Sequence, residues 1–158
     1  MQFDQQRIVL AGSAGTGKEN FARALLDYAS EDLIIAETAD VLTADTGKKA
    51  DFIVLFLCFS DANSFDQLQR SLVNVPADIL LTRCCVVIEQ YKNEETSAFP
   101  RGSLDILLDR YNTIMPVYVD SPTSAVPAVA SKIMDVSNNT LLMLDVPGNA
   151  WWDEIKKT

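Results

Sequence analysis

A short apolar segment that runs directly into a glycine-rich loop constrains the fold of this chain more than any other feature. Residues 7–11 read Arg-Ile-Val-Leu-Ala, which is typical of a buried strand, and residues 12–19 read Gly-Ser-Ala-Gly-Thr-Gly-Lys-Glu. The loop fits the pattern G-x-x-x-x-G-K, in which backbone N–H groups surround a phosphate at the start of a helix. The segment therefore predicts a strand, a phosphate loop and a helix in direct succession.

The loop departs from this pattern at its last position, where Glu19 stands in place of Ser or Thr. In a working loop that hydroxyl binds the Mg²⁺ ion that bridges the phosphates, whereas Glu19 brings a carboxylate to a site built for anions. Two readings follow: the glycines only form a tight turn, or the loop still holds a phosphate that Lys18 reaches. We interpret the loop as vestigial and predict no cofactor and no metal ion. Its residues of interest are Gly12, Gly15, Gly17, Lys18 and Glu19.

Length and charge limit the classes of protein to consider. The chain has 158 residues, 48% of them hydrophobic, and its formal net charge is −9. This size supports one core that buries roughly two thirds of the unfolded surface. We therefore expect a single domain over residues 1–158, with a C-terminal tail at about 138–158. The acidic balance leaves no basic stripe for DNA or RNA and disfavours an anionic membrane surface.

Three cysteines, Cys58, Cys84 and Cys85, all lie inside apolar runs. Their number is odd, and the chain has no histidine that could complete a zinc site. We expect buried, reduced thiols.

Strands and helices are predicted to alternate along the chain. The run at 52–59 is nearly all apolar, as expected of a central parallel strand that is covered on both faces. The alternation predicts an α/β fold with three layers, in which helices cover both faces of a doubly wound, mostly parallel sheet. The predicted strands are 7–11, 33–36, 52–59, 84–88 and 116–119.

Four helices are predicted from apolar residues that recur at helical spacing. Asn63 or Ser64 can cap the second helix, Ser103 can cap the third, and Pro127 suits the first turn of the last. The residues expected to face inward are Phe21, Leu25 and Tyr28, then Phe65, Leu68 and Leu72, then Leu104, Leu107, Leu108 and Tyr111, and finally Val126, Val129, Ala130 and Ile133.

A GTPase would need two switch regions after the first helix, and neither is recognisable. Only residues 29–32 are available for the first switch, which is too short to fold over a phosphate. The second begins D-x-x-G, and the nearest string, Asp-Thr-Gly-Lys at 45–48, is one residue short. This string also runs into the strand at 52 without room for a switch helix.

The motifs that read guanine are also missing. An N-K-x-D motif should follow the strand at 84–88, but residues 89–93 read Glu-Gln-Tyr-Lys-Asn and lack the Asp. The string Glu-Thr-Ser-Ala at 95–98 imitates the last guanine motif but lies too early, and residues 120–123 hold Asp-Ser-Pro-Thr instead. We therefore predict a small-GTPase-like (P-loop) fold with degenerate switch regions and no hydrolytic activity.

The middle of the chain resembles the centromere protein M family. The resemblance is carried by an Asp that opens a long apolar strand, Asp51 with 52–57, by Ser64 at the next helix start, and by the stretch 75–87, which leads from Val-Pro-Ala through Arg83 into a cysteine-containing strand. It is weaker but collinear over the phosphate-loop strand, the strand at 116–119 and the last helix. These residues describe packing rather than catalysis.

The resemblance implies a scaffold that neither binds nor hydrolyses GTP, with no catalytic residues to carry over. It implies a subunit of the constitutive centromere-associated network at the inner kinetochore, in the nucleus, that binds centromere protein I beside centromere proteins H and K. The chain departs from the vertebrate pattern in keeping Gly12, Gly17 and Lys18. The alternative is a nucleotide-binding protein of the small GTPase type with an altered Mg²⁺ site.

Outside the predicted strands and helices, large apolar side chains are concentrated in the tail at about 138–158. A Leu-Leu-Met-Leu run at 141–144 is separated from Trp151 and Trp152 by Pro147 and Gly148. The tail either folds back into a groove or presents the tryptophans to a partner, because Trp is enriched at the centres of interfaces. Trp151 and Trp152 are the candidate partner-binding residues.

A fold of this type without nucleotide must stabilise its empty pocket in another way. We expect a shortened loop or a contact between Lys18 and Glu19. If the loop is vestigial, Lys18→Ala should cost under about 1 kcal/mol and leave partner binding intact.

Overall fold

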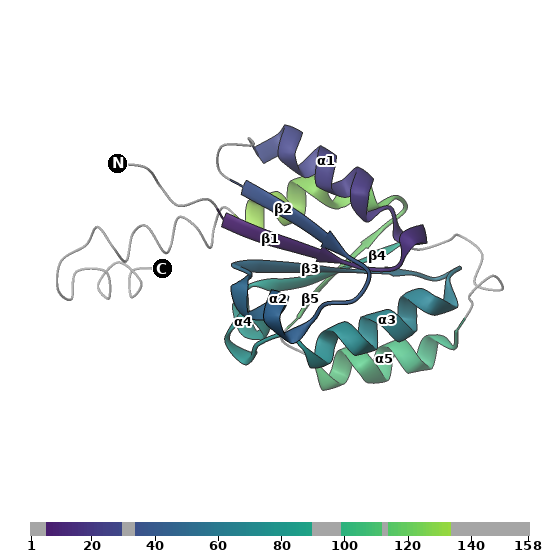
Figure 1. Ribbon diagram of the computed structural model, residues 1–158. Coiled ribbons are helices and arrows are strands. Elements are labelled where there is room, and N and C mark those ends of the chain that lie inside the picture. The colour runs from purple at the N-terminus through teal and green to yellow at the C-terminus, as the bar shows by residue number, and fades with distance from the viewer. Residues whose placement is uncertain (1–5, 30–33, 90–98, 112–113, 134–158) are drawn as a thin grey trace, which may run out of the picture.

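The computed structural model describes residues 6–29, 34–89, 99–111 and 114–133. Five strands form one sheet in the order β2-β1-β3-β4-β5, and every neighbouring pair is parallel (Figure 1). The predicted α/β class and parallel sheet are confirmed. The strands are β1 (Gln6–Ala11), β2 (Ile34–Ala39), β3 (Phe52–Cys58), β4 (Cys84–Glu89) and β5 (Met115–Val119).

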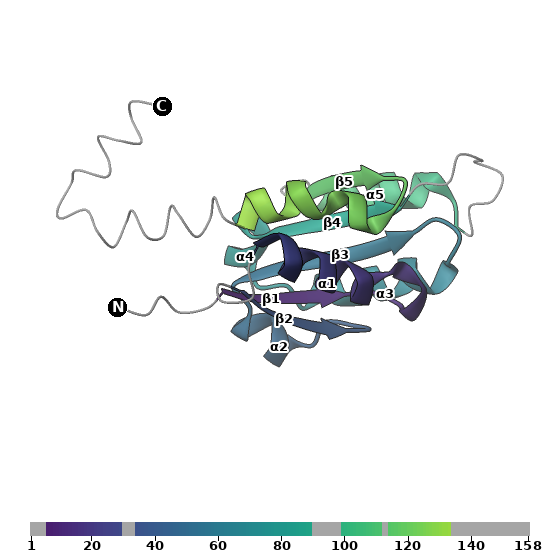
Figure 2. The same cartoon turned by 90° about the horizontal axis from the view of Figure 1, so that it is seen from above.

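Helices cover both faces of this sheet (Figures 1 and 2). One face carries α1 (Lys18–Ala29) and the helical residues 126–133, which follow a 3-10 turn, η3 (Pro122–Ala125). The arrangement is compatible with a three-layer fold of the Rossmann or GTPase-like type. The opposite face carries α2 (Ala44–Lys49), α3 (Ala62–Val73), α4 (Ala77–Thr82) and α5 (Arg101–Arg110).

The central strand β3 divides the core into two parts. All seven of its residues are buried, and alternate side chains point to opposite faces. Ile53 and Leu55 pack under α3 and α5, whereas Val54 and Phe56 pack under α1. Phe56 meets Phe21 of α1 edge to face, with ring centroids 5.1 Å apart. Burial on both faces explains why this strand reads as a continuous apolar run.

The strand order places a reversal beside β1. From β1 the chain first adds β2 on one side and then crosses to add β3 on the other. The segments that follow β1 and β3 lead to α1 and α3, on opposite faces of the sheet. In open α/β sheets, such a reversal opens a crevice at the carboxyl ends of the strands, where ligands bind. The glycine-rich loop after β1 lies at this position.

The predicted inward residues are buried or half-buried, with one exception. Tyr28 of α1 is 61% exposed, so its predicted inward orientation is wrong. It is the penultimate residue of α1, and an exposed tyrosine ring keeps its polar hydroxyl in solvent. The predicted face of the last helix is confirmed, because Val126, Val129, Ala130 and Ile133 are all buried.

Helix starts differ from the prediction. The N-cap of α3 is Asp61, whose Oδ1 accepts a 3.0 Å hydrogen bond from the Asn63 N–H. The Ser64 hydroxyl is buried instead; it donates to the Cys58 carbonyl at 2.9 Å and accepts from the Cys58 N–H at 3.0 Å. Pro100 occupies the N-cap position of α5, so Ser103 lies in its first turn. Ser64 thus bonds to the end of β3 and does not cap its own helix. Sequence spacing alone does not distinguish these two roles of a serine near a helix start.

Two short helices were not predicted, because six residues are too few for a periodic pattern. The first, α2, is capped by the Thr43 hydroxyl, which accepts from the Thr46 N–H at 3.2 Å. It contains residues 45–48 themselves, and only Ala50 and Asp51 separate it from β3, so no further helix follows this string before the strand. The second, α4, buries Ile79 against the same side of the sheet.

The three cysteines are free and buried, as predicted. Among the described residues, no helix combines the length and apolar character needed to cross a membrane.

Candidate functional site

The loop between β1 and α1 uses its own polar groups to hold its shape. A single 3-10 turn, η1 (Ala14–Thr16), occupies its middle and includes Gly15. The Thr16 N–H and the Thr16 hydroxyl both donate to the Ser13 carbonyl, at 3.1 and 2.6 Å. Two donors that could face a ligand are therefore bonded within the loop.

Two of its glycines are required by packing and backbone geometry. A Cβ atom on Gly12 would lie 2.8 Å from the Phe56 Cβ and 2.9 Å from the Thr16 Oγ1. Gly17 has a φ of +74°, in the left-handed region that favours glycine. A Cβ on Gly17 would also meet the Pro122 ring at 3.4 Å. Both requirements come from the chain's own packing and backbone geometry, so they support the reading of a tight turn.

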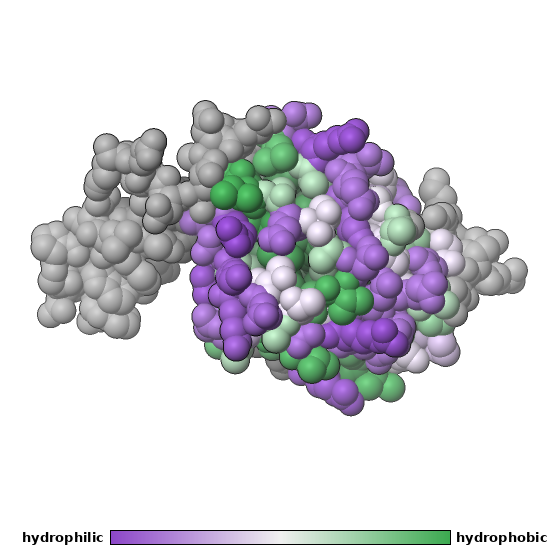
Figure 3. All heavy atoms as spheres, viewed as in Figure 1, coloured by the Kyte–Doolittle hydropathy of each residue, from purple (hydrophilic) through white to green (hydrophobic). Residues whose placement is uncertain are grey.

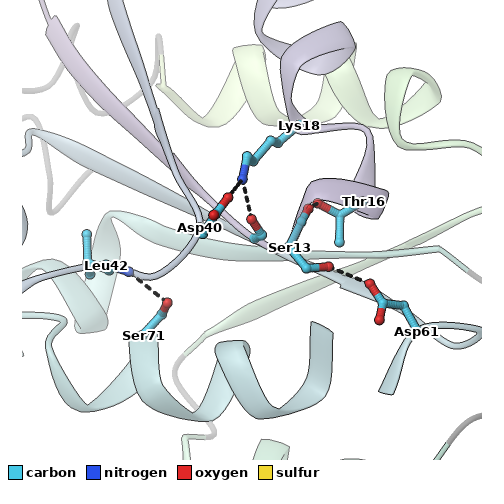
Figure 4. Close-up of polar contacts among 8 residues, drawn as sticks. Ser13, Thr16, Lys18, Asp40, Leu42, Asp61 and Ser71 are labelled. Atoms are coloured by element: carbon cyan, nitrogen blue, oxygen red, sulfur yellow. Dashed lines mark hydrogen bonds and ion pairs between the residues drawn. The ribbon is translucent and has the colours of Figure 1, made fainter. Parts of the chain in front are cut away.

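Lys18 is the centre of the site (Figure 4). Its side chain is almost completely buried, and the ammonium donates to the Gly12 carbonyl and to Asp40 Oδ1, the latter at 2.5 Å. Asp40 directly follows β2, and its own side chain is 71% exposed. The expected Lys18–Glu19 contact is wrong, because Glu19 lies on the exposed side of the first turn of α1.

A second carboxylate binds the loop from the side of β3. The Ser13 hydroxyl donates to Asp61 Oδ2 at 2.6 Å (Figure 4). Because Oδ1 of Asp61 caps α3, this one side chain joins the loop after β1 to the helix after β3. The strands on either side of β1 are β2 and β3. A carboxylate that follows each of them, Asp40 after β2 and Asp61 after β3, is thus bound to a residue of the loop.

The position of Asp40 is set by backbone contacts on both sides. The Gly12 N–H donates to the Ala39 carbonyl at 3.0 Å, immediately before Asp40. Two residues after it, Leu42 is fully buried; its N–H donates to the Ser71 hydroxyl at 2.9 Å, and its carbonyl accepts from the Asn74 amide at 2.8 Å. The segment from β2 to α2 is therefore attached to both β1 and α3.

Charge decides what this arrangement can do. The only described acceptors of the Lys18 ammonium are the Gly12 carbonyl and Asp40, both from the chain itself. A phosphate brought to the ammonium would meet the Asp40 carboxylate first. Two like charges 4 Å apart repel by about 4 kcal/mol at an effective dielectric constant of 20. The site as it stands is closed to an additional anion unless the Asp40 side chain moves.

Sequence reasoning missed both carboxylates, although one signal was present. The string nearest to D-x-x-G, residues 45–48, lies in α2, where Gly47 packs against the Asn74 carbonyl. Residues 37–40 read Glu-Thr-Ala-Asp and lie at the carboxyl end of β2, beside β1. An acidic residue that directly follows a strand next to the loop is the signal that would have found Asp40.

Other predicted positions are only partly described. Glu89 is the last residue of β4, and residues 90–98 lie outside the described residues. Asp120 and Ser121 form a bend before η3, whose Pro122 covers Gly17. The run 141–144 and the two tryptophans, Trp151 and Trp152, also lie outside them. Within the part of the chain that the structure describes, no three Asp, Glu, Cys or His side chains are grouped to hold a metal ion.

Comparison of the sequence with models of known protein families finds no match. Comparison with curated proteins finds none either.

Proposed function

We propose that this chain is a non-catalytic, small-GTPase-like interaction subunit. The observation that carries the proposal is the contact of Lys18 with Asp40. In a working phosphate loop the lysine faces the phosphates; here the chain's own carboxylate takes that place. Because Asp40 neutralises the Lys18 ammonium, the fold of the loop does not require a bound nucleotide.

The strand order supports the finer assignment to a small-GTPase-like fold. The glycine-rich loop follows β1, the strand beside which the sheet reverses its order, and α1 begins with Lys18 of that loop. The degenerate switch regions agree with this assignment: four residues separate α1 from β2, and a six-residue helix occupies 44–49.

The residues that carry the family resemblance have structural partners. The Asp51 carboxylate accepts a 2.8 Å hydrogen bond from the Arg7 N–H and so joins the start of β3 to β1. The Ser64 hydroxyl joins the end of β3 to α3. Such residues preserve a fold rather than a reaction. They are compatible with the centromere protein M resemblance. The proposed place at the inner kinetochore, bound to centromere protein I beside centromere proteins H and K, rests on that resemblance.

One observation favours the alternative, a nucleotide-binding protein with an altered Mg²⁺ site. Gly12, Gly17 and Lys18 are all kept, and the Asp40 side chain is exposed enough to turn away. This alternative requires that the purified protein retain or bind guanine nucleotide.

The output of a non-catalytic subunit is a contact surface, which typically covers about 800 Å² per partner around an apolar or aromatic centre. Trp151 and Trp152 are our first candidates for that centre. Figure 3 shows hydrophobic residues gathered amid hydrophilic ones on the face seen in Figure 1. The helices on the side of α3 also leave large apolar side chains exposed, namely Val73, Leu81 and Ile106.

Two measurements on the purified chain test the proposal. Chromatography of the denatured protein should show neither GDP nor GTP, and the chain should co-purify with centromere protein I when the two are co-expressed. A stoichiometric guanine peak would establish the nucleotide-binding alternative. If the purified chain carries no nucleotide and does not co-purify with centromere protein I, the interpretation of the loop as non-catalytic would stand, but the kinetochore assignment would be contradicted.

A further inference from the structure

We propose that Asp40 is an internal substitute for a phosphoryl group, and that withdrawing its carboxylate opens an oxyanion site at Lys18. The site would take an inorganic phosphate or the phosphoryl end of a larger molecule. This inference goes beyond the proposed function, because it concerns the loop alone and not the partner surface.

The unequal burial of the two charges indicates which of them moves. The Lys18 side chain is 3% exposed and is also fixed by the Gly12 carbonyl, whereas the Asp40 side chain is 71% exposed. A rotation of the Asp40 side chain returns its carboxylate to water at little cost in solvation. The same movement leaves the ammonium buried with one neutral acceptor, which is an unfavourable state for a cation. A second anion that binds the Lys18 ammonium in place of the carboxylate would neutralise this buried charge.

The backbone around Asp40 allows this exchange without unfolding. Ala39 is held by Gly12 and Leu42 by Ser71, so the main chain on both sides of Asp40 is attached. Only the side chain needs to leave. Since the carboxylate is tethered next to the ammonium, it competes at a high effective concentration with any free anion. The intact chain is therefore expected to bind free phosphate poorly.

The other nearby acidic groups do not block the site in the same way. Asp61 is bonded to the Ser13 hydroxyl and the Asn63 N–H, and Glu19 is exposed on α1. Neither is seen to contact the Lys18 ammonium, whose described partners are Gly12 and Asp40. Removing the Asp40 charge alone should thus be sufficient.

The test uses the full chain and two variants, Asp40→Ala and Asp40→Asn. Thermal unfolding is followed while inorganic phosphate, or pyrophosphate, replaces chloride at constant ionic strength, and ³¹P NMR titration measures binding directly. Both variants should show a saturable rise in Tm, with an apparent Kd for phosphate at least tenfold lower than that of the wild type. Asp45→Ala, which removes an exposed carboxylate of α2, should behave as the wild type does.

Three results would overturn the proposal. The first is an equal phosphate response in wild type and variants, since Asp40 would then block nothing. The second is no response in either variant, or failure of both to fold even in phosphate buffer, since phosphate could then not replace the carboxylate. The third is a response that survives Lys18→Met in the Asp40→Ala background.

A GDP titration separates a phosphoryl site from a nucleotide site. GDP should bind Asp40→Ala no more tightly than pyrophosphate does, because the proposed site consists of the lysine and its loop, and the motifs that read guanine are missing from the sequence. A tenfold gain from the nucleoside would overturn the restriction to phosphoryl groups. Co-purification of the same variants with centromere protein I is measured in parallel, so failure of the partner assignment remains distinguishable from failure of the oxyanion site.

Discussion

The Lys18 ammonium is a buried cation with a partner from a distant part of the chain, 22 residues away. Its role is structural in this fold: it joins the loop after β1 to the end of β2. Buried charges are costly to leave unpaired, whereas an exposed carboxylate that loses its partner is readily hydrated. The two ends of this ion pair therefore differ in what their removal should do.

Lys18→Ala should destabilise the protein by about 1–2 kcal/mol, more than the sequence alone predicted, because it removes a buried stem and two hydrogen bonds. Asp40 is hydrated after the change, which keeps the cost moderate. Urea unfolding measures the difference, and Lys48→Ala, at an exposed position of α2, should stay within about 0.5 kcal/mol of wild type. If Lys18→Ala lowers the free energy of unfolding by no more than Lys48→Ala does, the ion pair between Lys18 and Asp40 is not formed in solution. Co-purification with the partner should be unchanged.

Gly12→Ala should destabilise the protein by about 1–3 kcal/mol, because the added Cβ would lie 2.8 Å from the Phe56 Cβ in a strand that cannot shift. Gly102 is the matched control, since a Cβ there meets nothing within 4 Å. Gly102→Ala should be neutral or stabilise α5 by up to about 1 kcal/mol. Equal effects of the two changes on the urea midpoint would contradict the close approach of the loop to β3.

At the scale of elements, β4 combines five buried residues, 84–88, with two adjacent thiols at its start. Burial raises the pKa of the Cys84 thiol from 9.0 to about 12. For Cys85, burial and the neighbouring Cys84 raise the pKa, and Lys132 opposes them. Both thiols therefore stay protonated in the folded state at a pH where the unfolded chain ionises them.

This difference predicts a loss of stability in alkali. Between pH 9 and about 12 the folded chain binds more protons than the unfolded chain, so stability is complete below pH 9 and decreases above it. By pH 10, one unit above the unfolded value of 9.0, each thiol should cost roughly 1.4 kcal/mol. In urea unfolding, the loss of stability between about pH 8 and pH 10 should be about 3 kcal/mol smaller in the double variant Cys84→Ala, Cys85→Ala than in wild type. An equal loss in both proteins would show that the thiols do not contribute.

At the scale of the whole molecule, helices cover both faces of the sheet, and the proposed function requires that a partner cover part of the surface. Within the described residues, buried apolar side chains cover both faces of β3. If the tail serves as an anchor for a partner, altering it should leave these two clusters unchanged.

Trp151→Ala combined with Trp152→Ala should abolish co-purification with centromere protein I while Tm stays within a few degrees of wild type. A sharp fall in Tm would place the tryptophans in the core and move the search to the exposed helix positions, with Ile106→Asp as the next variant. No change in either property would exclude the tail as the interface.

The sequence by itself determined the strands and the main helices, because their signals are local. The apolar runs at 52–58 and 84–88, and the helical spacing at 126–133, reflect burial that each element experiences along its whole length. The glycine pattern also located the loop at the start of α1. Six-residue helices such as α2 and α4 were missed, because they are too short for such periodicity.

Only the tertiary structure decided how the loop is closed. Asp40 and Asp61 lie 22 and 48 residues from the loop side chains they bind, and the strand order β2-β1-β3 is what brings both to its rim. No local pattern encodes that order, because it depends on which strands pair. The sequence showed the lysine of the loop, Lys18, and Glu19 in place of the Ser or Thr that binds Mg²⁺. The fold supplied the carboxylate that neutralises the lysine, since the ends of parallel neighbouring strands meet at one edge of the sheet.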